Sequence, residues 1–250
     1  MAQIISDTQS GFLKERSIHN NIRLVLDLLD YSDRIEDDGF ILFLDFCKAV
    51  NRVEHPFILD TLRHFGFGDG FREIINMLYD DINSSVSLPF GTCSRFEVRR
   101  VICQGCPTSP LLFIMTAEIL AIILKNSEDV KQLNVMGCPL IVSQLADDTT
   151  LFLKNAAQIR KALKTISSLS EASGLKLNLN KCELMAIHDQ PLTSIEGIPM
   201  KKEVRYLGYT VSKDLKDREK AYFENILKKS KTILNTWLQR DLSIFGRMLI

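Results

Sequence analysis

The chain has 250 residues, of which 46% are hydrophobic and 25% are charged, and its formal net charge is zero. This composition is ordinary for a globular protein of one large domain or two small ones, and the zero charge gives no sign of a nucleic-acid partner. The longest apolar run, Leu111 to Leu124, is shorter than the ~20 residues that span a bilayer. With no signal-peptide pattern after Met1, we expect an intracellular protein, nuclear or cytoplasmic, with no membrane partner.

The first half of the chain predicts helices, one buried strand and a hairpin. Apolar residues recur at helical spacing in residues 17–31, behind a possible N-cap at Ser17. The run FILFLDF (40–46) has the length of a strand. The remaining elements are a helix from Pro56 to Gly66, a helix over residues 71–82, and a hairpin over residues 84–101 with Pro89, Phe90 and Gly91 in its turn.

The second half alternates helices and strands. The predicted elements are a strongly apolar helix from Pro110 to Lys125, a strand, polar break and strand over 140–153, an amphipathic helix over 155–172 ended by Gly174, strands over 176–187 and 203–211, and a basic helix from about residue 214. Interleaved strands and helices of these lengths favour an α+β or α/β layer architecture.

The cysteines and the charge distribution give weaker signals. Only Cys103 and Cys106 have the C-x-x-C spacing, and no second pair or suitably placed histidine accompanies them. We expect reduced thiols rather than a zinc site. Residues 171–250 hold 14 basic and 10 acidic side chains, whereas residues 1–100 hold 11 and 16. The basic C-terminal third is a possible face for a nucleic-acid backbone.

Two acidic clusters indicate chemistry. Asp45 lies inside the apolar run 40–46, and Asp147 and Asp148 form a polar break between two apolar strands. An ionised carboxylate in such a run is costly unless it is paired or bound to a cation. Carboxylates on rigid strands suit Mg²⁺, so together the three predict a two-metal site for phosphoryl transfer.

Each cluster also has an ordinary structural explanation. An Asp-Asp pair suits a hairpin turn, and Asp45 could pair with a buried lysine or arginine. The residues around the clusters decide between the two interpretations.

Six motifs resemble those of LINE-type reverse transcriptases, in the order and at roughly the spacing of that family. They are QSGFLKERSIHNNI (9–22), LDFCKAV (44–50), CQGCPTSP (103–110), LADD (145–148), SGLKLNLNKCELM (173–185) and VRYLG (204–208). The resemblance covers nearly the whole chain. It implies an α+β polymerase palm, with a ferredoxin-like antiparallel sheet and helices on one face, together with partial fingers. We expect fingers and palm over 1–212 and the start of a truncated helical thumb over 213–250.

The resemblance also implies roles for individual residues. Asp45, Asp147 and Asp148 would hold Mg²⁺ or Mn²⁺, and Lys181 would be the general acid for the leaving pyrophosphate. A lysine has suitable chemistry for that step, although a surface lysine at a strand end is the simpler explanation. The nucleotide-binding residues would be Lys14, Arg16, Phe46, Val50, Gln104 and Gly105, and the Phe46 carbonyl would add a backbone ligand for the metal. The primer would contact Tyr206, Leu207 and Gly208, where a buried strand tyrosine is the alternative.

Five positions depart from the family pattern without removing a metal ligand. Val50 replaces an aromatic residue, Asn51 an aspartate, Cys103 a basic residue, and Glu15 and Val101 replace glycines. We therefore weigh two functions: a polymerase that extends a DNA primer with dNTPs on an RNA template, and a catalytically inactive remnant that at most binds nucleic acid. A nucleotide cyclase on a similar palm is discounted, because its Gly-Gly-acidic-Glu-Phe turn is absent. The oligomeric state is left open.

Overall fold

A computed structural model describes residues 4–34, 38–103 and 105–238 of the chain. Contacts divide the chain into two units, Met1–Lys201 and Lys202–Ile250. The two units are described separately below.

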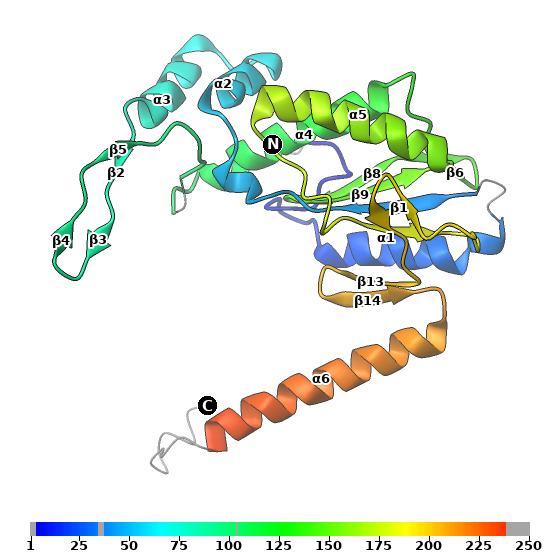
Figure 1. Cartoon of the computed structure of the whole chain (residues 1–250). Helices are drawn as coiled ribbons and strands as arrows, with labels where there is room; N and C mark the ends of the chain where they lie inside the picture. Colours follow the sequence, from blue (N-terminus) through cyan, green and yellow to red (C-terminus); the bar gives the residue numbers. More distant parts are fainter. Residues whose placement is uncertain (1–3, 35–37, 104, 239–250) are drawn as a thin grey trace. The chain divides into compact units, whose positions relative to one another are not determined.

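The first unit is built around a four-stranded antiparallel sheet (Figure 1). In spatial order the strands are β10 (Glu183–Ala186), β1 (Phe40–Leu44), β9 (Asp148–Leu153) and β8 (Val142–Leu145). Because β1 is central and both of its faces are covered, all five of its residues are buried. This explains why residues 40–44 form a continuous apolar run instead of alternating with polar residues.

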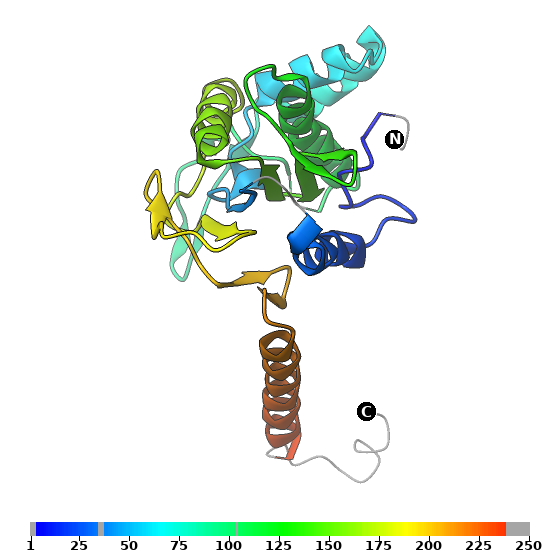
Figure 2. The same cartoon turned by 90° about the vertical axis from the view of Figure 1, so that its right-hand side faces the viewer.

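Helices cover both faces of this sheet, whereas the sequence predicted helices on one face. Figure 1 and Figure 2 show α4 (Ser109–Asn126) and α5 (Ala156–Ser173) over one face and α1 (Ile18–Asp30) over the other. Successive strand residues point to opposite faces, so Leu42 packs in the core beneath α4 and α5 while Ile41 points to the other side. That second face is also apolar, and the buried stripe of α1 covers it. Apart from this difference, the predicted α+β palm architecture is confirmed.

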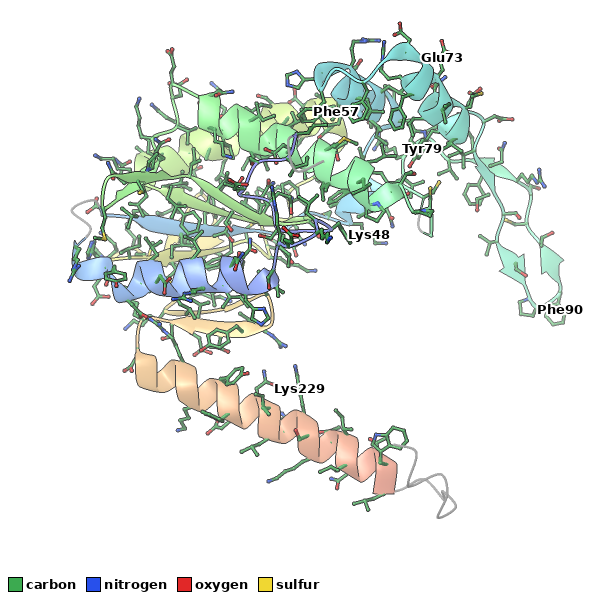
Figure 3. The ribbon with its side chains drawn as sticks, turned by 180° about the vertical axis from the view of Figure 1, so that it is seen from behind. Lys48, Phe57, Glu73, Tyr79, Phe90 and Lys229 are labelled. Carbon is green, nitrogen blue, oxygen red and sulfur yellow. The ribbon has the colours of Figure 1, made fainter. Side chains whose placement is uncertain are left out.

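A second core lies around α2 and α3, and the predicted hairpin follows α3 in the chain. α2 spans His55–His64, with Pro56 in its first turn, and α3 spans Asp69–Tyr79. The hairpin consists of β2 (Asn83–Ser84), β3 (Ser87–Leu88), β4 (Gly91–Thr92) and β5 (Phe96–Glu97). Phe90 lies fully exposed at its tip (Figure 3), so the predicted turn is confirmed.

Two short hairpins and two 3-10 turns were not predicted. The hairpins are β6 (Leu133–Val135) with β7 (Cys138–Leu140), and β11 (Ser194–Ile195) with β12 (Ile198–Pro199); the 3-10 turns are η1 (Ser32–Arg34) and η2 (Ala49–Asn51). Segments of two or three residues are too short to show a periodic pattern. The predicted strand over 176–187 is also shorter, because only Glu183–Ala186 joins the sheet.

Helix α4 is the one helix in the described part of the chain that is long and apolar enough to cross a membrane. More than half of it is buried within the protein, including Phe113, Ile114 and Leu120. A core helix that is apolar all round has this composition, so the burial accounts for it.

The second unit contains a hairpin and one long helix. The predicted strand over 203–211 is wrong: β13 (Glu203–Tyr206) and β14 (Tyr209–Ser212) are two strands joined by a tight turn. The turn residues Leu207 and Gly208 have φ of 49° and 84°, which is the combination that a two-residue hairpin favours. Strand β14 packs against α6 (Leu215–Leu238), so contacts group the hairpin with the helix in this unit. The palm–thumb boundary at 212/213 stays a prediction.

Candidate active site

The sheet register brings the two acidic clusters together, as the sequence predicted. Strand β1 ends at Leu44, which pairs with Thr149 of β9. Continuing this antiparallel register by one residue places Asp45 opposite Asp148, at the end of the sheet from which Lys48 also projects (Figure 3). The prediction that these strands are antiparallel neighbours is confirmed.

Asp147 lies in the tight turn between β8 and β9. Leu145 pairs with Asp148, which leaves Ala146 and Asp147 as the two turn residues. Ala146 has φ of 55°, a left-handed conformation that is uncommon for a residue with a Cβ. Such a conformation persists when the surroundings hold it in place. The direction of the Asp147 and Asp148 side chains therefore depends on what fixes this turn.

The carboxylates are close enough to repel one another. The protein packed around the Asp148 carboxyl raises its pKa, and the charges of Asp147 and Asp45 raise it further, although Asp148 keeps exposed surface. Burial also raises the pKa of the neighbouring Cys182 thiol, to about 11, so this thiol adds no negative charge near Asp45 at neutral pH. Three carboxylates thus give the site a high density of negative charge.

The donor set fits a hard divalent cation. Three carboxylates converge at one sheet end, and the pKa of Asp148 is raised first by burial and then by the charges of Asp147 and Asp45, which a cation would offset. Among the residues that the structure describes, no group of three or more His, Cys, Asp or Glu side chains is arranged so that it could hold a metal ion by itself. Substrate phosphates and water would have to complete the coordination, which is how Mg²⁺ is usually held.

Phe46 and Lys181 flank this site. The segment 176–178 runs beside residues 45–47, through hydrogen bonds from the Cys47 N–H to the Lys176 carbonyl (2.8 Å) and from the Asn178 N–H to the Asp45 carbonyl (2.8 Å). These bonds leave the carbonyl of Phe46 itself out of the pairing, so it can serve as a ligand. The Lys181 side chain is exposed, in the turn between residue 178 and β10.

Two of the predicted nucleotide-binding residues line a largely apolar cavity of about 360 Å³. Val50 and Gly105 line it, together with Cys103, Phe12 and Phe113. Gln104, the remaining predicted residue of this loop, lies outside the described residues. The structure therefore brings Val50 together with Cys103 and Gly105 although they are about fifty residues apart in the chain.

The two cations predicted to touch the triphosphate have different surroundings. Lys14 is exposed. The Arg16 guanidinium instead donates to the carbonyls of Ser6, Gln9 and Ile5 and pairs with Asp7 at 3.3 Å, so its side chain is only 15% exposed. These contacts make Arg16 a residue that holds the loop 5–9, a use that its place in the sequence did not indicate.

Sequence reasoning missed Gln9, which is fully buried against the acidic turn. Its side-chain oxygen accepts from the Ala146 N–H at 2.8 Å, and its amide donates to the Ala146 carbonyl at 3.3 Å. The two residues are 137 positions apart, so no local pattern could have revealed the contact. The only sequence signal was the place of Gln9 at the start of the motif 9–22.

The predicted primer-binding residues lie together in the second unit. Tyr206 is buried, 5% exposed, as the strand alternative expected, and Leu207 and Gly208 form the turn of the β13–β14 hairpin. If this hairpin contacts a primer, it does so through the turn and its backbone rather than through the tyrosine ring.

Two departures from the family pattern are at backbone positions that favour glycine. Glu15 has φ of 68° and Val101 has φ of 151°. Both replace glycines of the resembled motifs, so the backbone keeps a conformation that the substituted side chains disfavour. A β-branched residue such as Val101 is the more strained of the two.

We predict that Val101→Gly increases the free energy of unfolding by about 1 kcal/mol. Relief of the backbone strain contributes ~1–3 kcal/mol, and the greater freedom of glycine in the unfolded chain offsets ~0.4–1 kcal/mol of it. Denaturant unfolding measures the difference. Val101→Ala is the matched control: it keeps the Cβ and should gain less than Val101→Gly, and equal gains in both variants would contradict the strain argument.

Residues 1–211 match the family described as reverse transcriptase (RNA-dependent DNA polymerase). The chain is 31% identical over 184 residues to the "Retrovirus-related Pol polyprotein from type-2 retrotransposable element R2DM" of Drosophila melanogaster, covering 73% of this chain and 17% of that protein. It is 26% identical over 181 residues to the "Transposon TX1 uncharacterized 149 kDa protein" of Xenopus laevis, covering 72% of this chain and 14% of that protein. The chain thus spans less than a fifth of either relative.

Among solved structures, telomerase from Candida tropicalis with a TWJ fragment of telomeric RNA superposes with a TM-score of 0.58 at 11% identity. The match covers 82% of this chain and 33% of that one. Telomerase from Candida albicans, also with such a fragment, gives 0.54 at 15% identity over 78% of this chain and 33% of that one. At these identities the likeness shows the fold alone.

A palm sheet with converging carboxylates, and a family match over most of the chain, define the class of protein: it belongs to the reverse transcriptase family, whose members are RNA-dependent DNA polymerases. Within that family, the chain is a reverse transcriptase of the non-LTR retrotransposon (LINE) type. The family uses a divalent metal and binds an RNA template and a primer.

Proposed function

We propose that this chain extends a DNA primer on an RNA template by transferring nucleotides from dNTPs. The observation that carries the proposal is the convergence of Asp45 with Asp147 and Asp148 at one end of the β1–β9 pair. The apolar cavity with Val50 and Gly105 in its lining is the proposed site for the sugar and base of the incoming nucleotide.

Each group in the site has a role that follows from its position. Asp45, Asp147 and the Phe46 carbonyl would hold the cation, Mg²⁺ or Mn²⁺, with Asp148 as a third carboxylate. A cation bound there would offset phosphate charge and lower the pKa of the attacking primer hydroxyl. The exposed Lys181 ammonium would donate a proton to the departing pyrophosphate. Lys14 would contact the triphosphate, and the β13–β14 turn would contact the primer.

A primer-extension assay on the purified chain tests the proposal. A DNA primer annealed to an RNA template should be extended with dNTPs in Mg²⁺ or Mn²⁺, and Asp45→Asn should abolish extension. Lys201→Gln, a change at an exposed lysine outside the site, is the matched control and should extend like the parent. A parent chain that binds the primer-template without extending it would support the alternative below.

The alternative is an inactive remnant that folds and binds nucleic acid. The nucleotide cavity favours it, because Cys103 and Val50 line the wall where the family has a basic and an aromatic side chain. A neutral thiol cannot pair with a phosphate or a carboxylate as a guanidinium can.

We predict that Cys103→Arg tightens nucleotide or template binding and increases extension. A charge-assisted hydrogen bond to phosphate contributes ~1.5–3 kcal/mol, which corresponds to roughly 10–100-fold in affinity. Titration of labelled primer-template and of dNTP measures the change. Cys103→Met, which adds length without charge, is the control, and a Cys103→Arg protein that folds but binds no better than the parent would show that the position does not contact substrate.

A further inference from the structure

The turn that bears Asp147 and Asp148 is held from outside the sheet by the N-terminal segment. Residue 9 lies beside Gln144 at the edge of β8, in a short parallel pairing. The Gln144 N–H donates to the Thr8 carbonyl at 2.7 Å, and the Ser10 N–H donates to the Gln144 carbonyl at 2.8 Å. The segment is therefore attached to β8 on both sides of Gln9, directly before the turn begins.

The Gln9 side chain reaches from this attachment to the turn itself. One oxygen, Oε1, accepts from the N–H groups of both Ala146 and Gly11 at 2.8 Å, and Nε2 donates to the Ala146 carbonyl at 3.3 Å. Both backbone polar groups of the left-handed residue Ala146 are thus satisfied by one side chain. No hydrogen bond within the hairpin could do this, because Ala146 is one of its two turn residues.

Gly11 shows how closely the two segments fit. A Cβ at this position would lie 2.6 Å from the Ala146 nitrogen and 2.9 Å from Gln9 Oε1. These distances are shorter than any ordinary contact, and the Ala146 nitrogen belongs to backbone that cannot rotate away. Only glycine lets the N-terminal segment approach the turn in this way.

Arg16 and Asn21 support the same attachment. The Arg16 guanidinium donates to the Gln9 carbonyl at 2.6 Å, and the Asn21 amide donates to the Gln144 carbonyl at 3.0 Å and to Ser143 Oγ at 2.8 Å. Gln9 is therefore fixed at its backbone while its side chain contacts the turn. A rigid support of this kind is what a residue needs to orient a neighbouring group.

We infer that Gln9 is the positioning residue of the acidic turn: its amide holds Ala146 in the left-handed conformation that directs Asp147 and Asp148 toward Asp45. The inference rests on the proposed function for its catalytic consequence. Without the amide, the repelling carboxylates would relax apart by rotation about the turn. Residues that orient metal ligands typically change metal affinity or activity by roughly 10–100-fold when they are replaced.

Two variants of the full chain test the inference by different routes. Gln9→Met removes all three side-chain hydrogen bonds at similar size, and Gly11→Ala keeps Gln9 but pushes its segment off the turn. Both should speed hydrogen exchange of the Ala146 amide without any cation present. Both should also raise, by roughly 10–100-fold, the Mg²⁺ concentration that gives half of the maximal thermal stabilisation. In both variants the maximal rate of primer extension should fall, whereas the dNTP concentration that gives half of the maximal rate should change little.

Ser17→Ala is the matched control within the same segment. The Ser17 hydroxyl caps α1 by accepting from the His19 N–H, so its loss lowers the melting temperature without touching the turn. Exchange at Ala146 and the Mg²⁺ response should stay as in the parent. If Gln9→Met and Gly11→Ala behave like Ser17→Ala, Gln9 only fills the interior and the inference is wrong. Because the exchange measurement requires no polymerase activity, a parent chain that fails to extend a primer contradicts the proposed function alone.

Discussion

An Asp45→Asn, Asp147→Asn double variant should lose the thermal stabilisation that Mg²⁺ or Mn²⁺ gives to the parent chain. A cation that binds only the folded state adds about 1.4 kcal/mol at ten times its Kd, which raises the melting temperature of a chain of this size by about 3–6 °C. Removing two of the three carboxylates removes the site. Thermal unfolding with increasing cation concentration measures the response.

The same variant should be more stable than the parent when no cation is present. The folded-state pKa of Asp148 is raised, so ionisation of this carboxyl opposes folding. Asp148 therefore contributes favourably to the free energy of unfolding at low pH, and this contribution is lost as the pH rises through the folded-state pKa. Replacing Asp45 and Asp147 lowers that pKa again. The gain in melting temperature over the parent should therefore be seen at pH 7 and fade toward pH 4.

The same change in charge, made elsewhere in the chain, serves as the control for this experiment. Asp60→Asn and Asp69→Asn remove carboxylates that lie on α2 and α3, each in an exposed ion pair with an arginine. That double variant should keep the full cation response. A response that survives in the Asp45, Asp147 variant but is lost in this control would place the cation on α2 and α3.

The second prediction concerns sugar selection, and Val50→Phe should make the chain reject ribonucleotides. In the resembled family an aromatic residue at this position collides with a ribose 2′-hydroxyl. Val50 has no ring to collide with the 2′-hydroxyl. Without that collision, the site should no longer discriminate against ribonucleotides. Val50 lines the cavity, so a larger side chain at this position would extend into the proposed site of the sugar. We expect the ratio of dNTP to rNTP incorporation to rise by on the order of 10–100-fold.

Incorporation of both sugars and the melting temperature, measured for parent and variant, test this prediction. Val50 also packs against the second core, so its alternative role is to fill space, and in that case a larger residue would destabilise by ~1–3 kcal/mol. Val50→Leu adds bulk without a ring and is the matched control. A Val50→Phe protein that melts at a lower temperature and keeps the sugar preference of the parent would contradict the proposed role of residue 50 in sugar selection.

Much of the fold follows from the sequence, because long periodic segments bury one face wherever they are placed. The helices α1, α4 and α5 and the strands β1, β8 and β9 were predicted to within a few residues. The short hairpins β6–β7 and β11–β12 were missed, since two or three residues carry no period. The 203–211 segment was read as one strand because its turn, Leu207-Gly208, contains an apolar residue in a left-handed conformation.

For the candidate site, the sequence by itself predicted the chemistry: carboxylates in apolar runs are costly unless they are paired or bound to a cation, and three of them together favour a metal site. Tertiary structure alone decided the register that places Asp45 opposite Asp148, the use of Arg16 as a support for loop 5–9, and the contact of Gln9 with Ala146. It also decided that helices cover both faces of the sheet. Three of these depend on which distant segments meet, whereas Arg16 contacts a loop only 7 to 11 residues before it. Neither these contacts nor a hydrogen bond across 137 residues leaves a trace in local hydrophobic periodicity.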